Sequence, residues 1–322
     1  MIRWLALLAF LAPSFAMAQL RTFEGNIQLE NGNSIFVKTV APRESAPTIV
    51  FFNGLTDRLQ SWDSLTTNLV SRGYGIVAFD FMGQGRTLLS NKVPTKGVAV
   101  WNQVEDVREL LSKLEVQEPI HLAGFSYGGG IAQAYAARYP QSIATLTLMA
   151  PFTTSIESQD AYFRWQAAQH RILFPFDTRE YDEIYDQYLR TYVFSNYPLV
   201  EPALLEPFRL EGVFRLVQGV RHFNSFDVIE LLPKAKLHLI IGTFDQLIPR
   251  KMQDEFWERL PRDVRASRLL LEGVEHRIPL YAPNGAARWI HRIVSGDPEI
   301  SNGRTFTLNP WMLSSQNETE AR

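Results

Sequence analysis

The sequence predicts an α/β protein, in which a mostly parallel sheet is flanked by helices and carries a helical insertion. Short apolar segments alternate with segments of helical periodicity along most of the chain, which is typical of buried parallel strands joined by helices. The alternation stops between residues 152 and 230, where aromatic residues concentrate and no clear strand pattern occurs. A Gly-x-Ser-x-Gly sequence at residues 124–128 lies between a predicted strand and a predicted helix.

The predicted elements follow one another in a regular order. Residues 23–40 are expected to form a hairpin, because apolar segments flank the turn sequence Asn31-Gly32. Strands of the central sheet are predicted at residues 48–52, 74–79, 120–125, 143–149, 237–243 and 266–273. Helices are predicted at residues 61–72, 104–114, 129–138, 249–260 and 285–294. This order of elements predicts a sheet that is covered by helices on both faces.

The same pattern divides the chain into a core, an insertion and a tail. Residues 19–151 and 231–296 are predicted to form the α/β core, and residues 152–230 a helical cap between its two parts. Residues 297–322 are polar and irregular, so we expect them to be a flexible C-terminal tail.

Residues 1–18 have the pattern of a secretory signal peptide. Arg3 supplies a positive charge, residues 4–12 are apolar, and Ala16-Met17-Ala18 gives a small-x-small cleavage site before Gln19. The alternative is a retained membrane anchor, but the apolar run is shorter than the about 20 residues that span a bilayer. No later segment has the pattern of a transmembrane helix. We therefore expect an exported protein, periplasmic or secreted.

Composition and charge exclude several classes of protein. The chain of 322 residues is 46% hydrophobic and 20% charged, which is typical of a globular protein. Its net charge is −2 and it has no long basic run, so we expect neither nucleic acid nor an anionic membrane surface as a partner. It has no cysteine, which excludes disulfides, thiol catalysis and cysteine-ligated metals.

Ser126 is the candidate nucleophile. The segment Gly124-Phe125-Ser126-Tyr127-Gly128 follows a predicted strand and opens a predicted helix, which is the context that a nucleophile elbow requires. The tight turn needs small residues at its flanks, and it projects the serine hydroxyl above the sheet edge. The alternative is a glycine-rich turn with a serine that caps the helix. Its position at a strand–helix junction favours the catalytic interpretation.

A serine hydroxyl needs a general base and a carboxylate that orients the base. Of the six histidines, His276 follows the last core strand, which places it at the same sheet edge as Ser126. Asp245 follows the preceding strand, and the order Ser126, Asp245, His276 is the one expected of this kind of sheet. A loop cap is the alternative role for Asp245, and Asp160 is the next candidate for the acid.

Two backbone N–H groups are candidates for the oxyanion hole. Tyr127 follows the nucleophile, and Leu55 lies in the loop after the strand at residues 48–52, next to Gly54. The alternative for this loop is a plain Asn53-Gly54 turn without a ligand. The sequence Gly83-x-Gly85 lacks the third glycine of a dinucleotide-binding loop, so we reject a nucleotide site.

Together these motifs resemble the α/β-hydrolase superfamily, and specifically its capped serine members, over roughly residues 35–296. The residues that carry the resemblance are Asn53-Gly54, Asp80, Gly83-Gln84-Gly85-Arg86-Thr87, Gly124 to Gly129, Asp245 and His276. The chain departs from the family at Asn53, where His-Gly is usual. The resemblance implies the α/β-hydrolase fold, no metal and no organic cofactor.

A serine at the elbow distinguishes this chain from the dehalogenases and most epoxide hydrolases of the fold, which use aspartate. We therefore expect a serine hydrolase that cleaves carboxylic esters of small-molecule substrates through an acyl-enzyme intermediate. Aromatic residues of the cap predict apolar acyl or aryl groups. In the cap, Tyr181, Tyr185, Tyr188 and Tyr192 share a helical face that we expect to pack the cap onto itself or the sheet.

Two rival functions remain at the level of the sequence. An aminopeptidase-like amide hydrolase needs an acidic pocket for a free amine, for which the cap offers Glu157, Asp160, Asp182 and Glu183. A ligand-binding protein of the same fold needs no turnover, but the complete set of serine, acid and histidine argues against it. The sequence carries no indication of the oligomeric state.

Overall fold

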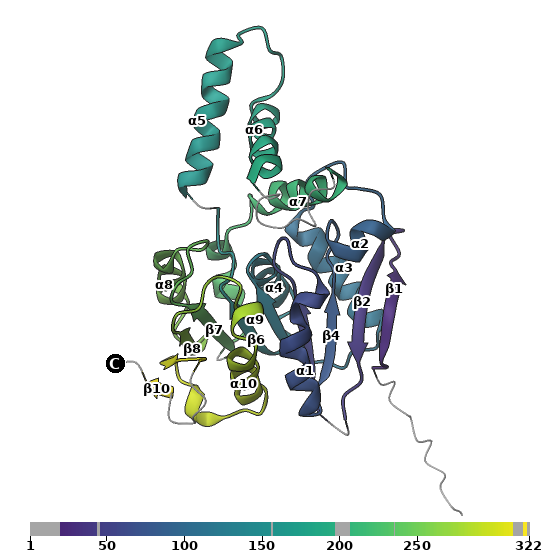
Figure 1. Ribbon diagram of the computed structural model, residues 1–322, viewed down its shortest axis with the longest axis vertical. Coiled ribbons are helices and arrows are strands. Elements are labelled where there is room, and N and C mark those ends of the chain that lie inside the picture. The colour runs from purple at the N-terminus through teal and green to yellow at the C-terminus, as the bar shows by residue number, and fades with distance from the viewer. Residues whose placement is uncertain are drawn as a thin grey trace, which may run out of the picture.

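The computed structural model describes residues 20–43, 46–155, 157–196, 207–234, 236–311 and 318–320. The predicted signal peptide at residues 1–18 lies outside these ranges. A ten-stranded sheet forms the centre of the molecule, in the order β1-β2-β4-β3-β5-β6-β7-β8-β9-β10 (Figure 1). The structure thus confirms the predicted α/β architecture with a mostly parallel sheet.

The first two strands, β1 (Phe23–Gln28) and β2 (Ser34–Val40), form the predicted antiparallel hairpin, and β2 joins the sheet antiparallel to β4. From β4 to β9 all neighbouring strands are parallel. These strands are β3 (Thr48–Phe52), β4 (Gly75–Phe79), β5 (Ile120–Phe125), β6 (Ile143–Met149), β7 (Leu237–Gly242), β8 (Arg265–Leu271) and β9 (Arg304–Leu308). Their carboxyl ends therefore meet at one edge, where ligands bind in sheets of this kind.

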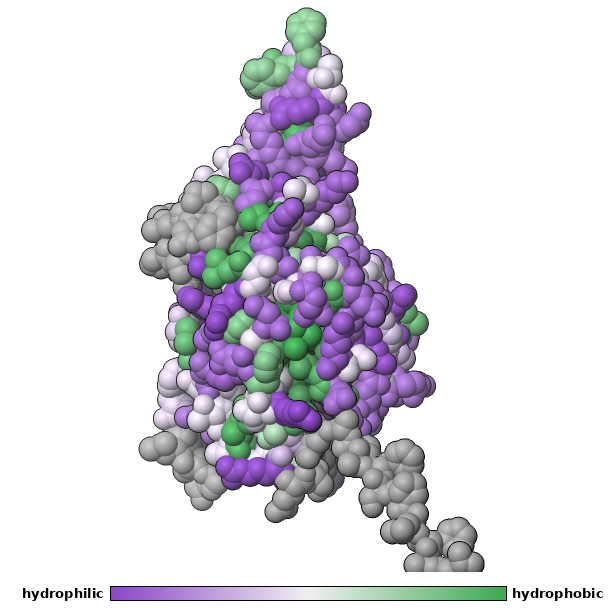
Figure 2. Space-filling view, turned by 90° about the vertical axis from the view of Figure 1, so that its right-hand side faces the viewer, coloured by the Kyte–Doolittle hydropathy of each residue, from purple (hydrophilic) through white to green (hydrophobic). Residues whose placement is uncertain are grey.

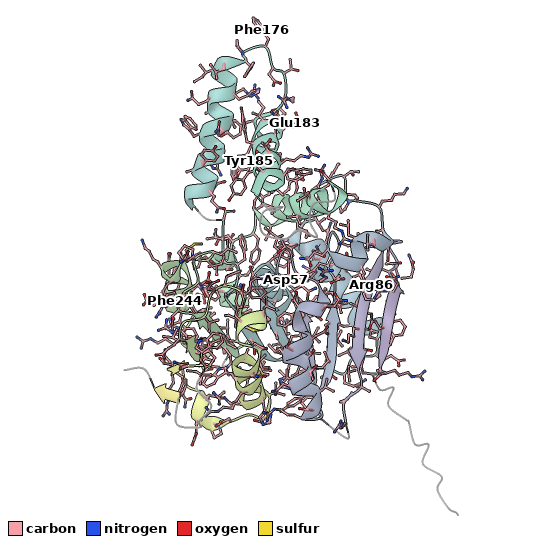
Figure 3. The ribbon with its side chains drawn as sticks, in the orientation of Figure 1. Asp57, Arg86, Phe176, Glu183, Tyr185 and Phe244 are labelled. Atoms are coloured by element: carbon pink, nitrogen blue, oxygen red, sulfur yellow. The ribbon has the colours of Figure 1, made fainter. Side chains whose placement is uncertain are left out.

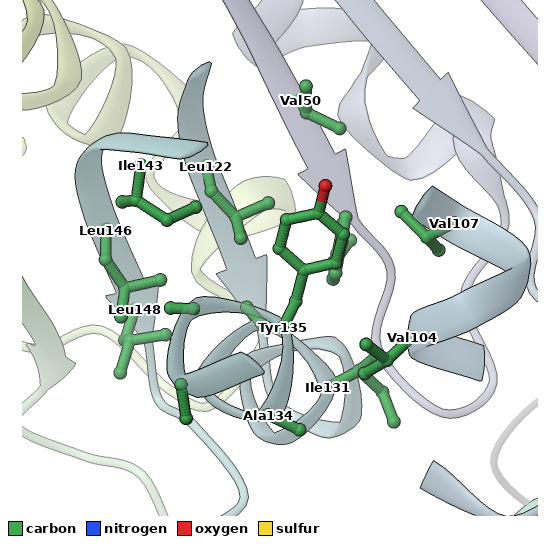
Figure 4. Close-up of a cluster of buried hydrophobic side chains, with 14 of the residues drawn as sticks. Val50, Val104, Val107, Leu122, Ile131, Ala134, Tyr135, Ile143, Leu146 and Leu148 are labelled. Carbon is green, nitrogen blue, oxygen red and sulfur yellow. The ribbon is translucent and has the colours of Figure 1, made fainter. Parts of the chain in front are cut away.

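Helices cover both faces of the sheet because alternate strand residues are apolar on each side. On one face lie α3 (Val100–Lys113), α4 (Tyr127–Arg138) and α8 (Arg250–Arg259). Figure 4 shows side chains of α3 and α4, such as Val107 and Tyr135, in the buried cluster that contains Leu122. On the other face lie α1 (Asp63–Ser71) and α10 (Pro283–Val294). The short helices α2 (Gly85–Ser90) and α9 (Ile278–Tyr281) complete the body.

A helical insertion separates β6 from β7. It contains α5 (Glu157–Leu173), α6 (Tyr181–Asn196) and α7 (Pro207–Val220). The hairpin of α5 and α6 extends away from the carboxyl edge of the sheet, and α7 lies at its base (Figure 1). Among the described helices, none is long and apolar enough to cross a membrane.

The insertion has a small core of its own. Phe163 and Ala167 of α5 pack against Ile184 and Leu189 of α6 and Val213 of α7. The tyrosine face of α6 joins this core, because Tyr185 is buried in it and Tyr188 and Tyr192 pack against it. Tyr181 instead donates a hydrogen bond to the Arg164 carbonyl at 2.9 Å. The expectation that this face packs the insertion onto itself is confirmed.

The expectation of a flexible tail over residues 297–322 was wrong for its first part. Arg304–Leu308 forms β9, which lies parallel to β8, and β10 (Glu318–Glu320) pairs with β9. The alternation in this segment buries Phe306 and Leu308, and the Phe306 ring lies 5.2 Å from that of Trp289. The strand was missed because its apolar residues are few and become a core face only against β8.

Leu122 tests the packing of the central strand. The side chain is buried beneath α4, so Leu122→Ala should leave a cavity and lower the free energy of unfolding by about 2–5 kcal/mol. Urea unfolding followed by circular dichroism measures this. Leu89→Ala is the matched control: Leu89 is exposed on α2, so its loss should cost less than about 0.5 kcal/mol. Equal losses in the two variants would contradict the packing described for β5.

Candidate active site

Ser126 has the strained backbone that the elbow motif predicts. Its φ is 50° and its ψ is −117°, a combination that L-residues rarely adopt. The Ser126 N–H donates to the Met149 carbonyl at 3.0 Å, which ties the turn to the end of β6. A Cβ at Gly124 would lie 2.7 Å from the Gly128 carbonyl oxygen, and one at Gly128 would overlap the Phe52 carbonyl. The turn therefore requires glycine at both positions.

The structure brings Ser126, His276 and Asp245 together. The Ser126 Oγ lies 2.9 Å from His276 Nε2, and His276 Nδ1 lies 2.8 Å from Asp245 Oδ2. All three residues are buried or nearly so, and they follow β5, β8 and β7 at the same edge of the sheet. The Phe125 ring lies 5.0 Å from the imidazole and packs against it. This geometry suits transfer of a proton from the hydroxyl to the imidazole.

The Asp245 carboxylate accepts hydrogen bonds from its own loop, and these bonds fix its orientation. Its Oδ1 accepts the backbone N–H groups of Leu247 and Ile248, both at 2.9 Å. Its Oδ2 accepts Gln253 Nε2 at 3.2 Å in addition to His276. One oxygen of Asp245 thus caps the loop before α8, while the other faces the imidazole, as the predicted catalytic role requires.

The alternative acid, Asp160, does not reach His276. It lies on α5, where it accepts hydrogen bonds from Arg164 at 2.5 Å and Tyr185 at 2.9 Å. Burial would raise the pKa of Asp160, but the bonds from Arg164 and Tyr185 outweigh it and hold the pKa below its usual range. Asp160 lines the same cavity as Ser126, so it belongs to the surroundings of the site.

The other histidines lie away from Ser126. His121 and His238 are in β5 and β7 and bond to Thr145 and Ser267. Burial lowers the pKa of His121 to about 4 and that of His238 to about 3, so both stay neutral near pH 7. The other three histidines also have protein partners. His170 bonds to Tyr188, His222 to Arg221 and His291 to Tyr74.

Leu55 and Tyr127 both lie at the cavity that contains Ser126. Within the part of the chain that the structure describes, neither backbone N–H donates to a protein acceptor. The Tyr127 phenol points into the core, where burial raises its pKa and Gln103 donates to it at 3.4 Å. Its N–H at the start of α4 therefore stays available for a ligand, as the N-terminus of a helix favours negative charge.

Gln84 fixes the loop that carries Leu55. Its Nε2 donates to the carbonyl oxygens of Gly54 and Leu55, each at 2.6 Å. Because both carbonyls are held from one side, the plane of the peptide between them is set and the Leu55 N–H cannot turn freely. A Cβ at Gly54 would lie 2.7 Å from the Phe125 ring, so the loop needs glycine there.

Asn53, the departure from the family pattern, is a structural anchor. Its Nδ2 donates to the Phe79 carbonyl at 2.6 Å and to Asp80 at 3.2 Å, and its Oδ1 accepts Trp62 Nε1 at 2.5 Å. Asp80 is buried and also accepts the N–H groups of Leu59 and Arg86. Burial raises the pKa of Asp80. These bonds hold the ends of β3 and β4 together below the loop of residues 53–57, which we call the oxyanion loop after its predicted role.

An ion pair connects the oxyanion loop to the loop of His276. Arg277 Nη2 lies 2.5 Å from Asp57 Oδ1, and both residues line the cavity. The side chain of Asp57 is 6% exposed and that of Arg277 is 31% exposed, so the pair is partly shielded from water. It joins the two segments between which a substrate carbonyl would lie.

Gln84 and the Asp57–Arg277 pair were missed by reasoning from the sequence. In the sequence, Gln84 is part of the Gly83-Gln84-Gly85-Arg86-Thr87 segment that carries the family resemblance, but no role is predicted for its side chain, and Arg277 belongs to no motif. The sequence feature that could have identified them is the presence of polar side chains in loops at the carboxyl ends of parallel strands.

A cavity of about 320 Å³ opens above Ser126, between the sheet edge and the base of the insertion. Apolar side chains form most of its wall, among them Phe125, Phe152, Phe163, Leu189, Val217 and Leu247. A polar group at the insertion contains Asp160, Tyr185 and Arg221, with the Arg221 guanidinium 4.3 Å from the centre of the Tyr185 ring. Figure 3 shows Tyr185 between α5 and α6. The volume suits a small organic molecule.

Residues 47–283 match the family model described as the alpha/beta hydrolase fold. The chain belongs to the alpha/beta-hydrolase family. The resemblance noted in the sequence is thereby confirmed at the level of the superfamily. The match spans both parts of the core and the insertion between them.

Similar proteins include enzymes with different named activities. A bifunctional esterase/perhydrolase of Acinetobacter calcoaceticus is 27% identical over 236 residues, which are 70% of this chain and 83% of that protein. A non-heme chloroperoxidase of Streptomyces lividans is 32% identical over 114 residues, 35% of this chain and 39% of that protein. These are alpha/beta-hydrolase relatives at low identity.

Solved structures agree on the fold. An alpha/beta hydrolase from a Medee basin deep-sea metagenome library has a TM-score of 0.65 at 18% identity, covering 84% of this chain and 97% of that one. A thermophilic esterase from Thermogutta terrifontis has a TM-score of 0.61 at 18% identity, covering 85% and 98%. At this identity the likeness concerns the fold alone.

Gln84→Leu tests the clamp on the oxyanion loop. Leucine keeps the volume but cannot donate to the Gly54 and Leu55 carbonyls, so we expect kcat for an ester to fall roughly tenfold with little change in KM. Steady-state kinetics with a chromogenic ester measures both constants. Gln103→Leu is the matched control, a buried glutamine that bonds to the Met82 carbonyl and the Tyr127 hydroxyl. An equal loss in both variants would show a general packing effect.

Proposed function

We propose that this protein is an exported serine hydrolase that cleaves carboxylic esters with apolar acyl or aryl groups. The observation that carries the proposal is the pair of contacts that joins Ser126 Oγ to His276 Nε2 at 2.9 Å and His276 Nδ1 to Asp245 Oδ2 at 2.8 Å, beneath a mostly apolar cavity. Export rests on the pattern of residues 1–18, with its positive start, apolar run and small-x-small site.

The proposed reaction has two steps. Ser126 Oγ attacks the ester carbonyl carbon while His276 Nε2 takes the hydroxyl proton, and the N–H groups of Leu55 and Tyr127 bind the oxyanion. The ester C–O bond then breaks, and His276 gives its proton to the leaving alcohol. Water then attacks the acyl carbon and loses a proton to His276. The bond between the acyl carbon and Ser126 Oγ breaks, His276 returns the proton to Oγ, and the acid leaves. Asp245 keeps the imidazole in the required tautomer and stabilises its cationic form.

The cavity wall supports apolar groups on the substrate. The side chains of Phe152, Leu189 and Val217 offer no hydrogen bond, so a polar substrate would lose its hydration there without compensation. Each methylene group that enters such a wall gains about 0.8 kcal/mol by leaving water.

Among the described residues, the acidic candidates for the aminopeptidase-like rival do not form an anionic pocket at the cavity. Of its acidic candidates, Asp160 already accepts from Arg164 and Tyr185, and Asp182 pairs with Arg221 at 3.3 Å. Glu183 lies in the first turn of α6 and accepts the backbone N–H of Glu180 at 3.0 Å, and the Glu157 side chain lies outside the described residues (Figure 3). The cation of Arg221 in the cavity wall disfavours a free ammonium group.

A series of 4-nitrophenyl esters of increasing acyl length tests the proposal. Each added methylene should raise kcat/KM roughly three- to fourfold until the cavity is filled. Matched 4-nitroanilides should react far more slowly. A flat response to acyl length would exclude the apolar preference, and faster turnover of the anilides would favour the amide hydrolase.

The variant Asp245→Asn tests the role of the acid with the same esters. It should retain the fold and reduce kcat by about 10⁴.

A further inference from the structure

The far end of the insertion exposes a group of large apolar side chains. Phe176 is 94% exposed, Ile172 and Leu173 are each 70% exposed, and Phe174 is 55% exposed. We call these four residues the apical patch. The insertion narrows to this end, where hydrophobic side chains stand clear of the polar shaft (Figure 2). Figure 3 shows Phe176 pointing away from the molecule.

The loop beside the apical patch is braced by polar contacts. His170 Nε2 lies 2.8 Å from Asp177 Oδ2, and its Nδ1 lies 3.1 Å from the Tyr188 hydroxyl on α6. Arg179 binds Asp177 through several hydrogen bonds and reaches Gln187 at 2.5 Å. These bonds fix the conformation of the turn. The exposure of the apolar side chains is therefore a feature of an ordered segment.

The outer face of α5 continues the apical patch. Ala161, Trp165, Ala168 and Ile172 are all exposed and follow the spacing of one helical stripe. The opposite face packs into the core of the insertion through Phe163 and Ala167. α5 therefore has apolar residues on two opposite faces. The inner face is buried in the core of the insertion, and the outer face has no partner among the described residues.

Charge at the apex is balanced. Between residues 170 and 180 the sequence has Arg171 and Arg179 against Asp177 and Glu180. Attraction to an anionic surface therefore contributes little, in agreement with the absence of a basic run in the chain. Arg164 and Arg171 flank the stripe on α5, where long side chains can keep their charge in water while the helix face enters an apolar layer.

The shape of the apical patch favours a lipid layer over a second copy of the chain. The patch is convex and narrow (Figure 2). A protein partner would therefore need a matching apolar groove, whereas a bilayer surface needs none.

We propose that the apical patch and the outer face of α5 dock into the surface of an uncharged lipid layer. The same helices line the cavity, through Phe163 on α5 and through Tyr185 and Leu189 on α6. Docking therefore holds the cavity beside a lipid phase, and the substrates are apolar esters dissolved in it. The assignment of substrates rests on the proposed function, whereas the docking itself does not.

Flotation of the full chain with phosphatidylcholine vesicles tests the docking. The unaltered protein should bind, and Leu173→Ser/Phe176→Ser should weaken the partition coefficient at least about tenfold. The matched control is Leu89→Ser/Leu231→Ser, which removes two exposed leucines from the body and should bind like the unaltered protein. Binding should change little with salt or with added anionic lipid. Hydrogen exchange should slow at residues 165–180 when vesicles are added.

Three outcomes overturn the docking. They are failure of the unaltered protein to bind, equal binding by the apical variant, and unchanged exchange at residues 165–180. A dimer in sedimentation velocity that the apical variant loses, without vesicle binding, would assign the patch to a second copy. Hydrolysis of a water-soluble ester should be the same in the apical variant and the unaltered protein. If the protein bound vesicles but had no esterase activity, the docking would be supported and the proposed function would be contradicted.

Discussion

The positive φ of Ser126 is the constraint on which the arrangement of the site depends. A serine at φ 50° is strained, and it persists because the end of β6 holds its N–H and glycines on both sides allow close approach. This conformation raises the hydroxyl above the sheet edge, where it faces His276 rather than capping α4. It also leaves the Tyr127 N–H at the start of a helix, free of an intrahelical partner. One turn thus places both the candidate nucleophile and a candidate oxyanion donor.

The rest of the site is held by neighbours that make no contact with the hydroxyl. Asn53 and Asp80 join the ends of β3 and β4, and Gln84 holds the carbonyls of the oxyanion loop. The bond between Asp57 and Arg277 links that loop to the one that carries His276. These groups are buried or partly buried, so the loss of one of these contacts would leave a shielded polar group unpaired. The result is a site that is shaped before any substrate enters.

The sequence predicted the parts that follow from local pattern. Ser126, Asp245 and His276 could be placed because each follows a strand of a parallel sheet, and such strands end at a common edge. The clamp at Gln84 and the Asp57–Arg277 pair could not, because their partners are close in space and distant in sequence. β9 was missed for the same reason, since Phe306 and Leu308 form a buried face only beside β8. Whether Phe176 is covered or exposed likewise depends on the direction of the α5–α6 hairpin.

The central claim is that His276 and Asp245 activate Ser126, and labelling with a fluorophosphonate tests it without knowledge of the natural substrate. The site of modification is mapped by mass spectrometry, and the rate is compared with that of His276→Ala. The arrangement at 2.9 and 2.8 Å predicts a label on Ser126 that forms far more slowly in the variant. No label on folded protein, a label on another serine, or equal rates with and without the imidazole would contradict it.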